Sequence, residues 1–595
     1  MPSRKPREGW SEAMKFSKLI IKNFRSIGPD GLSISFSVNS NLMALVGPNA
    51  VGKSNVLEAL GIVFGAFPFR GFDPEETDFF CKNTESEILI ELHLDPPLVE
   101  HDVYRSEFEI AGFRYRAARY KRGENKGTLH KEHYCFDSAG KILTKPVRMF
   151  RRKGAPDDGA DNAPKPVLVT DEAWKLGEFF YLDPPSLERF FDKTTGYSPL
   201  GRLFEIYRED FEAEHNQCSL DGKTKVLSKD AFKELCSRLA VVLRTAKLIE
   251  IEKGLSDRVE EYLGIHGDRP LRVEFALPSH REVFEKWIAL QVSEHKELPA
   301  LPADRLGSGY RALLRLAVLE TLLAVNKSER SIVLLIEEPE IYLHVHLKRY
   351  FYEVLRRLAE KGHQVAYVTH EPEFVDLGNP RDIVRLHRQS GKPTVAQQVR
   401  RDSAFNFPRM RQKVRRMGNA ELVFAQHAIL TEGEDDQGIL EELLVRKGVD
   451  PNVYSISVIV CDSRTQIADY VRLCSELGID FYVVHDRDDE NDASTKKQNQ
   501  IVAAAVEAAK PRLPALHVYN PDLEGAMGAV KRKQNLDQLL AILGNKDYAT
   551  ISQDHTNLVA PIDEFVTTRG LGQFAPARAV EAVPAAIAVP NSEKK

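Results

Sequence analysis

The chain has 595 residues, enough for several domains, because one hydrophobic core serves about 100–200 residues. Its 82 Lys and Arg residues are nearly balanced by 87 Asp and Glu residues, and the net charge of −5 excludes a polycation that binds nucleic acid over its whole surface. The six cysteines form no C-x-x-C pair, which argues against a zinc ribbon or disulfide framework and favours a reducing cytoplasm.

Targeting and membrane segments are not expected from the sequence. No apolar run reaches the roughly 18 residues that a membrane-spanning helix needs. The basic residues 1–10 have no apolar core, so they do not resemble a secretory signal. We therefore expect a cytoplasmic protein with no membrane partner.

A phosphate-binding loop is the strongest motif in the chain. Residues 47–54 read Gly-Pro-Asn-Ala-Val-Gly-Lys-Ser and fit the pattern G-x-x-x-x-G-K-S. An apolar run at 42–46 predicts a buried strand before the loop, and helical spacing follows it at 55–64. In this context the loop amides hold phosphates, Lys53 reaches the β- and γ-phosphates of ATP, and the Ser54 hydroxyl binds Mg²⁺. The nucleotide-binding residues predicted here are Asn49, Gly52, Lys53 and Ser54.

Alternating apolar and polar residues predict strands at 15–24, 32–36, 87–94 and 107–121, so the first 150 residues form a β-rich lobe with one helix. Basic residues cluster late in this lobe. They are either the solvated edge of a sheet or a contact to the DNA backbone. The cluster comprises Arg114, Arg116, Arg119, Lys121, Arg122, Arg148, Arg151, Arg152 and Lys153.

Helical periodicity replaces alternation between residues 171 and 263. Helices are predicted at 200–213, 229–245 and 249–263, and they carry no chemical motif. We interpret this region as a helical insertion that is either a dimer or partner surface or plain core packing. A short strand is expected next, at 271–276.

A Gly-Ser-Gly turn opens the next predicted helix, which runs to residue 325. Ser308 and Gly309 would present unpaired amides and the positive end of the helix dipole, which suit a γ-phosphate. A loop on the same rigid lobe as Lys53 cannot easily fold back onto it. We therefore expect this loop to complete the nucleotide site of a second subunit.

Two apolar strands, at 331–336 and 365–369, end in residues suited to catalysis. The first leads into Glu337, which would bind Mg²⁺ through water, and Glu338, which would polarise the attacking water. The second ends at His370, which could contact the γ-phosphate. His344 is a weaker candidate.

An arginine-rich segment at 400–417 separates this block from a second one and is either a charged linker or a strip that follows a phosphate backbone. Strands are then predicted at 427–431, 455–460, 481–484 and 516–519. They alternate with helices at 437–446, 466–477 and 495–510, a pattern that indicates a small parallel sheet.

Carboxylates follow the strands of this second sheet, where ligands bind in parallel sheets. Glu432, Asp486 and Asp488 come directly after strand ends, and Asp436 lies one helical turn beyond Glu432. Glu524 follows the last strand and could serve a second metal ion. Carboxylate oxygens are the ligands that hard divalent cations prefer, and a pair of such cations can hydrolyse a phosphodiester.

The first set of motifs resembles the ABC-type ATPases of the structural-maintenance-of-chromosomes kind. It comprises residues 47–54, the 306–309 turn, Glu337–Glu338 and His370, together with the opening Lys-Leu-Ile-Ile-Lys-Asn-Phe-Arg-Ser-Ile at 18–27. The phrase Glu-Glu-Pro-Glu-Ile-Tyr-Leu-His at 337–344 is similar to the version found in the OLD (overcoming lysogenisation defect) family.

The second set resembles the Toprim domain of topoisomerases, primases and OLD nucleases, through Glu432-Gly433 and Asp486-x-Asp488. The resemblance, which includes the ATPase subunit of Gabija anti-phage systems, implies a homodimer or higher oligomer that nicks or cuts DNA with Mg²⁺ or Mn²⁺. A helicase encoded nearby would be its partner in a Gabija-like pair. The resemblance to this family also implies a catalytic lysine near the C-terminus. Lys546 is the candidate, and Lys531 and Lys533 are rivals.

The expected fold class is α/β, with an ABC/SMC-like ATPase domain that contains a helical insertion and precedes a Rossmann-like Toprim domain. The expected parts are 1–170 and 264–399 (ATPase), 171–263 (insertion), 400–420 (basic linker), 421–570 (Toprim) and 571–595 (flexible tail). The expected function is an ATP-binding, metal-dependent DNA endonuclease in anti-phage defence. The alternative is an ATP-switched DNA clamp or scaffold whose Toprim acids are structural. Topoisomerase and primase chemistry would need a further DNA-binding domain or a zinc motif.

Overall fold

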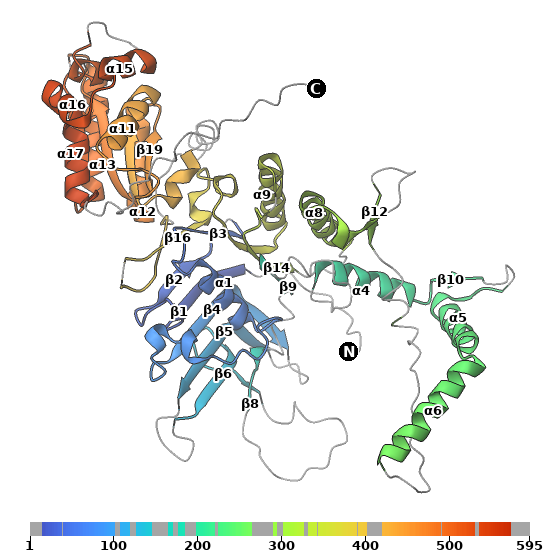
Figure 1. Ribbon diagram of the computed structural model, residues 1–595. Helices are drawn as coiled ribbons and strands as arrows, with labels where there is room; N and C mark the ends of the chain where they lie inside the picture. The colour runs from blue at the N-terminus through green and yellow to red at the C-terminus, as the bar shows by residue number, and fades with distance from the viewer. Residues whose placement is uncertain are drawn as a thin grey trace, which may run out of the picture. The chain divides into compact units, whose positions relative to one another are not determined.

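The computed structural model describes residues 15–37, 40–101, 107–119, 127–145, 165–169, 177–184, 198–219, 224–263, 282, 290–293, 301–325, 331–341, 343–389, 391–400, 419–488, 491–529 and 535–572. They form two compact units, the first made mainly of residues up to Ala396 and the second of residues from Gln397 onward (Figure 1). Among the described helices, none has the length and apolar character needed to cross a bilayer.

The first unit opens with an antiparallel sheet of five strands in the order β2-β1-β4-β5-β6. Alternating burial along β1 places Leu19 and Ile21 inward, and the register sets Leu19 opposite Ile34 and Leu92. The predicted β-rich lobe is therefore confirmed. The strands are β1 (Lys15–Lys22), β2 (Leu32–Ser35), β4 (Ile88–His101), β5 (Glu107–Arg119) and β6 (Leu129–Phe136).

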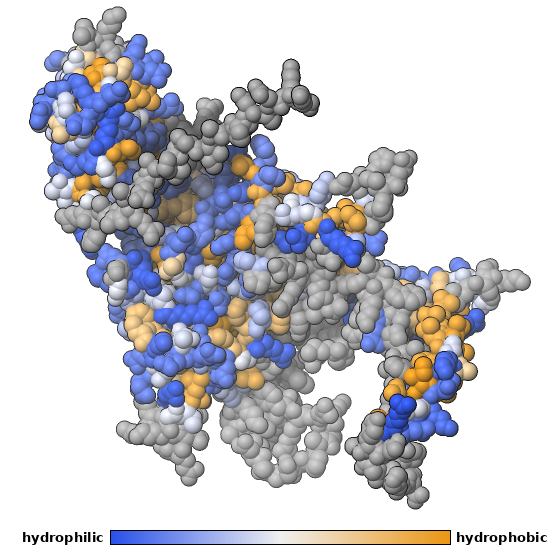
Figure 2. Space-filling view, in the orientation of Figure 1, coloured by the Kyte–Doolittle hydropathy of each residue, from blue (hydrophilic) through white to orange (hydrophobic). Residues whose placement is uncertain are grey.

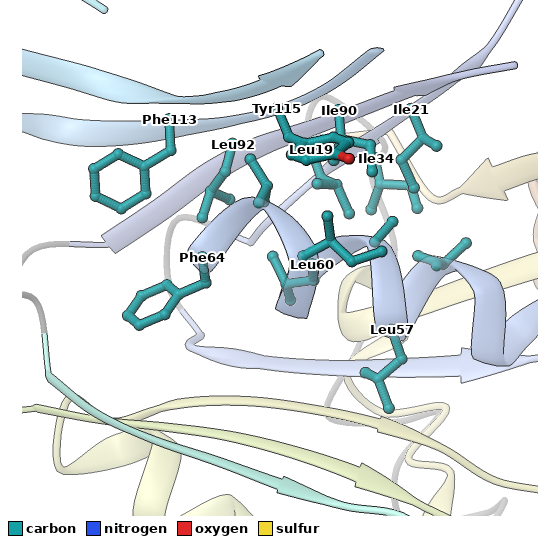
Figure 3. Close-up of a cluster of buried hydrophobic side chains, with 14 of the residues drawn as sticks. Leu19, Ile21, Ile34, Leu57, Leu60, Phe64, Ile90, Leu92, Phe113 and Tyr115 are labelled. Atoms are coloured by element: carbon teal, nitrogen blue, oxygen red, sulfur yellow. The ribbon is translucent and has the colours of Figure 1, made fainter. Parts of the chain in front are cut away.

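A second sheet carries the nucleotide motifs, and α1 (Lys53–Phe64) lies between the two sheets. Its order is β17-β16-β3-β15-β14-β9, and β3 pairs in parallel with both β15 and β16. Leu19, Ile90 and Leu92 face α1 from the antiparallel sheet, whereas Leu57 points from α1 to the opposite side (Figure 3). The strands are β3 (Leu42–Val46), β9 (Gly177–Leu182), β14 (Ser331–Glu337), β15 (Gln364–Val368), β16 (Ile383–His387) and β17 (Val395–Gln398).

The two faces of this sheet pack against different helices. Val333 and Leu335 of β14 join the core around α1. On β15, Tyr367 stacks edge-on against Phe374, which also contacts Tyr352 of α9 (Val345–Glu360). Buried strands that are covered on both sides explain why β3, β14 and β15 are continuous apolar runs in the sequence.

One boundary of the predicted helical insertion is wrong. Strand β9 lies inside the predicted 171–263 segment, yet it pairs in parallel with β14 and is the edge strand of the ATPase sheet. The insertion therefore starts after β9. The predicted helices are present as α4 (Pro199–Phe211), α5 (Ser228–Leu243) and α6 (Ala246–Leu263), with a hairpin of β10 (Gln217–Cys218) and β11 (Val226–Leu227) between the first two.

The second unit has a parallel sheet in the order β19-β18-β20-β21, as the alternation of strands and helices predicted. Ile439, Leu443 and Phe565 are fully buried in its core. Its elements are β18 (His427–Thr431), α11 (Glu434–Arg446), β19 (Ile456–Val460), α12 (Arg464–Leu477), β20 (Asp480–Asp486), α13 (Ala493–Ala509), β21 (Leu516–Tyr519), α14 (Leu523–Ala526), α15 (Leu536–Leu543), α16 (Tyr548–Asp554) and α17 (Thr556–Arg569).

Short elements complete the described chain. They are the hairpin strands β7 (Thr144–Lys145), β8 (Lys165–Pro166), β12 (Gln291–Val292) and β13 (Leu301–Pro302), the helix α8 (Ser308–Val325), and the 3-10 helices η1 (Glu76–Asp78), η2 (Phe80–Lys82), η5 (Ala303–Arg305), η6 (Pro372–Phe374), η7 (Pro380–Asp382) and η8 (Asn419–Phe424). The predicted strand at 271–276, nearly all of the 400–420 linker and the tail from 573 lie outside the described residues.

The packing of α11 gives a first prediction. Leu443 is completely buried, so Leu443→Ala should lower the free energy of opening of the second unit by about 2–5 kcal/mol. Val445 on the same helix is 58% exposed, and Val445→Ala should change it by less than about 0.5 kcal/mol. Hydrogen exchange of peptides from β18 and α11, read by mass spectrometry, measures both. Equal effects of the two substitutions would contradict this packing.

Candidate functional site

The phosphate-binding loop connects β3 to α1 in the geometry that its motif requires. Gly52 precedes α1 with a φ of 97°, and a Cβ at this position would lie 2.3 Å from the Ser26 hydroxyl. Only glycine satisfies both constraints. Lys53 and Ser54 are therefore the first residues of α1, where the helix amides and dipole favour a bound phosphate. Asn49 lies on the exposed part of the loop.

Lys53 is 5% exposed, which is unusual for an ammonium group. Burial lowers its pKa to about 8, although the nearby carboxylates of Glu338 and Glu340 oppose this shift. A triphosphate at the loop would supply the negative charge that stabilises the charged ammonium. The electrostatics of Lys53 thus suit its predicted role as a phosphate ligand.

Ser54 and Glu337, both predicted to hold Mg²⁺, are brought together although they are 283 residues apart in the sequence. The Ser54 hydroxyl donates a hydrogen bond to Oε2 of Glu337 at 3.1 Å. The Tyr181 hydroxyl donates to Oε1 at 2.8 Å. Burial raises the pKa of Glu337, and the nearby Glu58 and Asp183 add to that shift, so the carboxyl lies in a region short of positive charge.

Sequence reasoning missed Tyr181 and Asp183. Both lie at the carboxyl end of β9, where the register sets Leu182 opposite Ile336, and hence Asp183 beside Glu337. The run Gly-Glu-Phe-Phe-Tyr-Leu at 177–182, rich in aromatic residues, was the available signal for this strand.

Glu338, predicted to polarise the attacking water, has a strained backbone. Its φ is 49°, a left-handed conformation that is rare for a residue with a side chain. Its amide donates to the Val368 carbonyl at 2.9 Å, which fixes this turn against β15. Such strain is typical of functional positions and places Glu338 near both Lys53 and His370.

His370 is held by Glu340, a residue that the sequence did not single out. The buried Glu340 carboxylate accepts hydrogen bonds from the His370 amide at 2.8 Å and from the Thr369 hydroxyl at 3.0 Å. Burial lowers the pKa of His370, and Lys53 lowers it further, while Glu338 and Glu371 oppose the shift. The neutral imidazole is therefore favoured, and it lies close enough to Lys53 and Glu338 to feel their charges.

Ser308 and Gly309 begin α8, as predicted, but nothing in the described residues connects them to Lys53. Ser308 is exposed, and a Cβ added at Gly307 or Gly309 would meet no atom within 4 Å. The start of α8 is therefore an accessible helix N-terminus.

The described part of the first basic cluster matches the solvated-edge interpretation better than the DNA contact. Arg114 pairs with Glu91, and Arg116 pairs with Glu87. Arg119 donates to the Gly127 carbonyl. The other residues of the cluster and nearly all of the second basic segment lie outside the described residues.

The second unit gathers its predicted carboxylates at the carboxyl edge of the sheet. Burial, together with repulsion from Asp436, Asp488 and Glu432, raises the pKa of Asp486 to about 8. Burial likewise raises the pKa of Asp436 to about 6, with contributions from Glu432 and Glu524. Because each carboxylate acts on another, the five predicted metal ligands lie in one electrostatic cluster.

Backbone amides fix two of these side chains. Oδ1 of Asp486 accepts a hydrogen bond from the Leu523 amide at 2.9 Å. Oδ2 of Asp436 accepts one from the Gly433 amide at 3.0 Å, which forms the capping box of α11. The sharp turn at Asp488 has a φ of 53°.

Arg464 is the one cation that contacts the cluster in the described part of the second unit. Its Nε donates to Oε2 of Glu432 at 2.9 Å, and its Nη2 donates to Oδ2 of Asp488. The search for candidate ligands in the sequence considered acids and missed this residue. The signal was its position, because Arg464 follows β19 and so reaches the same sheet edge as the acids.

The donor set suits a hard divalent cation, because it consists of oxygen atoms and leaves the charge of Asp436 and Asp486 without a cationic partner among the described residues. No three His, Cys, Asp or Glu side chains of the described residues already surround a common point. Arg464 contacts two of the predicted ligands, Glu432 and Asp488. A cation held by three of the acids would therefore require these side chains to rearrange.

Lys546 is not brought to this cluster. It lies in an ion pair with Asp554, 2.7 Å from Nζ to Oδ2, and its carbonyl accepts a hydrogen bond from Arg446. Arg446 ends the 13-residue helix α11, whose first turn holds Asp436. At 1.5 Å per residue, that end lies about 15 Å from Asp436. The rivals Lys531 and Lys533 lie outside the described residues.

The crowded carboxylates predict a dependence on pH. The pKa of Asp486 is raised from 3.8 to about 8, so its contribution to stability is complete below pH 3.8 and is lost as pH rises through 8. In metal-free protein, the melting temperature should therefore fall between pH 6 and 8 more steeply in the wild type than in Asp486→Asn. Mn²⁺ should restore more stability at pH 8 than at pH 6, because the cation replaces the lost proton. Thermal unfolding at both pH values measures this, and identical pH profiles for the two proteins would refute it.

Two family models match the chain. The model described as "Overcoming lysogenization defect protein-like, TOPRIM domain" matches residues 423–488. The model described as "AAA ATPase domain" matches residues 14–139 and 209–375. The matched segments contain Lys53, Glu337 and His370 on one side and Glu432, Asp486 and Asp488 on the other.

Two similar proteins are nucleases by name. The chain is 27% identical over 533 residues to "OLD nuclease" of Thermus scotoductus, which covers 86% of this chain and 91% of that protein. It is 23% identical over 257 residues to "Old nuclease" of Escherichia phage P2, which covers 41% of this chain and 43% of that protein.

Solved structures of SMC head domains align with lower similarity. The SMC head bound to the C-terminal winged-helix domain of ScpA has a TM-score of 0.35 at 14% identity, over 65% of this chain and 98% of that one. The SMC head domain of Thermotoga maritima has a TM-score of 0.28 at 16% identity, over 65% and 99%. From the family models and the relatives, the chain joins an AAA ATPase domain to an OLD-like Toprim domain and is similar to OLD nucleases over most of its length.

Proposed function

We propose that this protein is an ATP-binding DNA endonuclease that depends on a divalent metal ion, Mg²⁺ or Mn²⁺. The observation that carries the proposal is the cluster of five carboxylates at the carboxyl edge of the second sheet. The similarity to an OLD nuclease over 91% of that protein supports the same activity.

Glu432, Asp436, Asp486, Asp488 and Glu524 would hold the metal. A divalent cation bound there would lower the pKa of a water molecule and stabilise the leaving oxygen of a phosphodiester. The chain's own contribution is orientation. The Leu523 and Gly433 amides hold the Asp486 and Asp436 carboxylates in fixed directions before any substrate arrives.

The ATPase site supports nucleotide binding with Mg²⁺ through Lys53, Ser54 and Glu337, and hydrolysis through Glu338 and His370. We infer that ATP binding controls access of DNA to the Toprim carboxylates. The accessible N-terminus of α8 at Ser308 would reach the triphosphate of a second copy, so the nucleotide site would be complete only in a dimer.

Exposed apolar side chains on α5 and α6 support such a homodimer. Val241 is 76% exposed, Val242 is 72% exposed and Ile249 is 52% exposed. Figure 2 shows apolar colour over these two helices. A contiguous apolar surface of this kind usually marks an interface with another protein.

A second candidate function is an ATP-switched DNA clamp whose Toprim acids are structural. The ion pairs of Arg464 favour it, because they already engage two of the predicted metal ligands. The clamp is also consistent with the described residues because no three of their His, Cys, Asp or Glu side chains are grouped to hold a metal ion. Cleavage assays separate the two functions.

Plasmid nicking tests the nuclease directly. Asp486→Asn and Asp488→Asn should each reduce nicking with Mn²⁺ or Mg²⁺ by about 100-fold or more, because each removes a negative ligand from the cluster. Asp435→Asn is the matched control, since Asp435 is an exposed acid next to Asp436, and it should keep full activity. ATP-dependent DNA binding by the wild type, without cleavage by any divalent metal, would instead establish the clamp.

The same variants test a role in antiviral defence, which the resemblance to Gabija systems motivates. Cells that express the wild type, with or without a helicase encoded nearby, should resist phage, whereas cells that express Asp486→Asn should not.

The proposed dimer gives a separate prediction. Val241→Asp with Val242→Asp should shift the protein towards monomer in sedimentation, because two charges cannot be buried in an apolar interface without a large desolvation penalty. Val445→Asp is the matched control, since Val445 is exposed on the second unit, and it should leave the mass unchanged. An unaltered oligomer in the double variant would exclude this surface as the interface.

A further inference from the structure

Arg464 occupies an unusual place in the second unit. It is the first residue of α12, directly after the loop that follows β19. In the sheet order β19-β18-β20, its side chain reaches past the end of β18 to the end of β20. There it contacts Glu432 and Asp488 at once, although it is only 3% exposed.

Charge balance explains why this buried guanidinium is tolerated. Burial of a cation costs free energy unless anions compensate it, and removal of one partner of a buried pair is strongly destabilising. The ion pairs with Asp488 and Glu432 outweigh burial and raise the pKa of Arg464 above its ordinary value. Conversely, Glu432 and Asp488 would repel one another without the arginine. In this corner of the cluster, one guanidinium partly compensates two carboxylates.

The rest of the cluster lacks this compensation. Asp436 and Asp486 are bonded to backbone amides, and their nearest charged groups are further carboxylates, including Glu524. Within the described residues, the cluster therefore has an uncompensated side at Asp436 and Asp486. Its other side, at Glu432 and Asp488, is already occupied by a cation that belongs to the protein.

We propose that Arg464 is a positioning residue that stands in for one divalent cation, holding Glu432 and Asp488 together until a metal ion displaces it from at least one of them. This inference rests on the proposed metal-dependent function. It adds an order of binding. The first ion enters the uncompensated side at Asp436 and Asp486 without breaking an ion pair, whereas the second must break one and so binds more weakly.

Guanidinium is a suitable stand-in because its fork offers two donors to two carboxylates, as a bridging metal ion would offer two coordination positions. Each carboxylate uses one oxygen for the arginine, Oε2 of Glu432 and Oδ2 of Asp488. The other oxygen of each can bind a metal ion while the arginine leaves. A charge inside the protein thus sets the metal concentration at which the site fills.

Titration of nucleotide-free, full-length protein with Mn²⁺, followed by electron paramagnetic resonance, tests the inference. Arg464→Gln should tighten the weaker Mn²⁺ site by about tenfold or more, because a competing unit charge is lost at short range. Arg472→Gln is the matched control. It removes the same charge from an exposed position eight residues further along α12, about 12 Å away, and should leave Mn²⁺ affinity within about twofold of the wild type, since exposed charges at that distance are largely screened. Equal or weaker Mn²⁺ binding by Arg464→Gln would overturn the inference.

Folding of the variant gives an independent readout. Metal-free Arg464→Gln should melt at a lower temperature than the wild type, because Glu432 and Asp488 then repel one another, and Mn²⁺ should raise its melting temperature by more than it raises that of the wild type. An equal or smaller rise would overturn the inference. If this variant does not fold even with Mn²⁺, Arg464→Lys replaces it, and the same tightening, by a smaller factor, is expected because lysine lacks the fork.

The outcomes also separate this inference from the proposed function. Mn²⁺ binding that is lost in Asp486→Asn but not tightened in Arg464→Gln would retain the metal site and reject the role of Arg464. Absence of Mn²⁺ binding in both the wild type and Arg464→Gln would reject the metal-dependent function itself.

Discussion

Repulsion between carboxylates at the carboxyl edge of β18 and β20 is the constraint on which the second unit depends. Asp486 and Asp436 are partly buried close to other acids, which would be unfavourable in a purely structural core. The fold tolerates this crowding through backbone amides and through Arg464. Such a concentration of negative charge is understandable if a cation completes it, which is why we assign function to this edge.

The first unit uses the same topological device for a different ligand. The ends of β3, β14 and β15 deliver Lys53, Glu337 and His370 to one edge of a parallel sheet. There the helix amides of α1 and a buried ammonium favour phosphate. Both units therefore gather residues that are distant in sequence by ending neighbouring strands at a common edge. We propose that one edge binds a nucleotide with its metal ion and that the other binds metal ions alone.

Much of this could be predicted from the sequence because the buried parallel strands are short apolar runs and the functional residues follow them directly. The pairing of Ser54 with Glu337 and the convergence of Glu432, Asp486 and Asp488 follow from that rule. Tyr181 was missed because β9 lies within a segment whose helical periodicity dominated, although its aromatic run was a signal for a strand. Arg464 was missed because only acids were considered as candidates after the strand ends, and its burial among them is visible only in three dimensions. Lys546 was chosen as the catalytic lysine although it pairs with Asp554, because the sequence around a lysine does not indicate which distant residues its side chain contacts.

Anomalous diffraction from crystals of the full-length protein grown with Mn²⁺ would test the assignment of metal chemistry to the second unit most directly. We expect an anomalous peak within about 2.0–2.6 Å of carboxylate oxygens of Asp486 and of at least one further acid of the cluster. Mn²⁺ bound beside Ser54 and Glu337 alone, with Arg464 still bridging Glu432 and Asp488 at saturating metal, would contradict it.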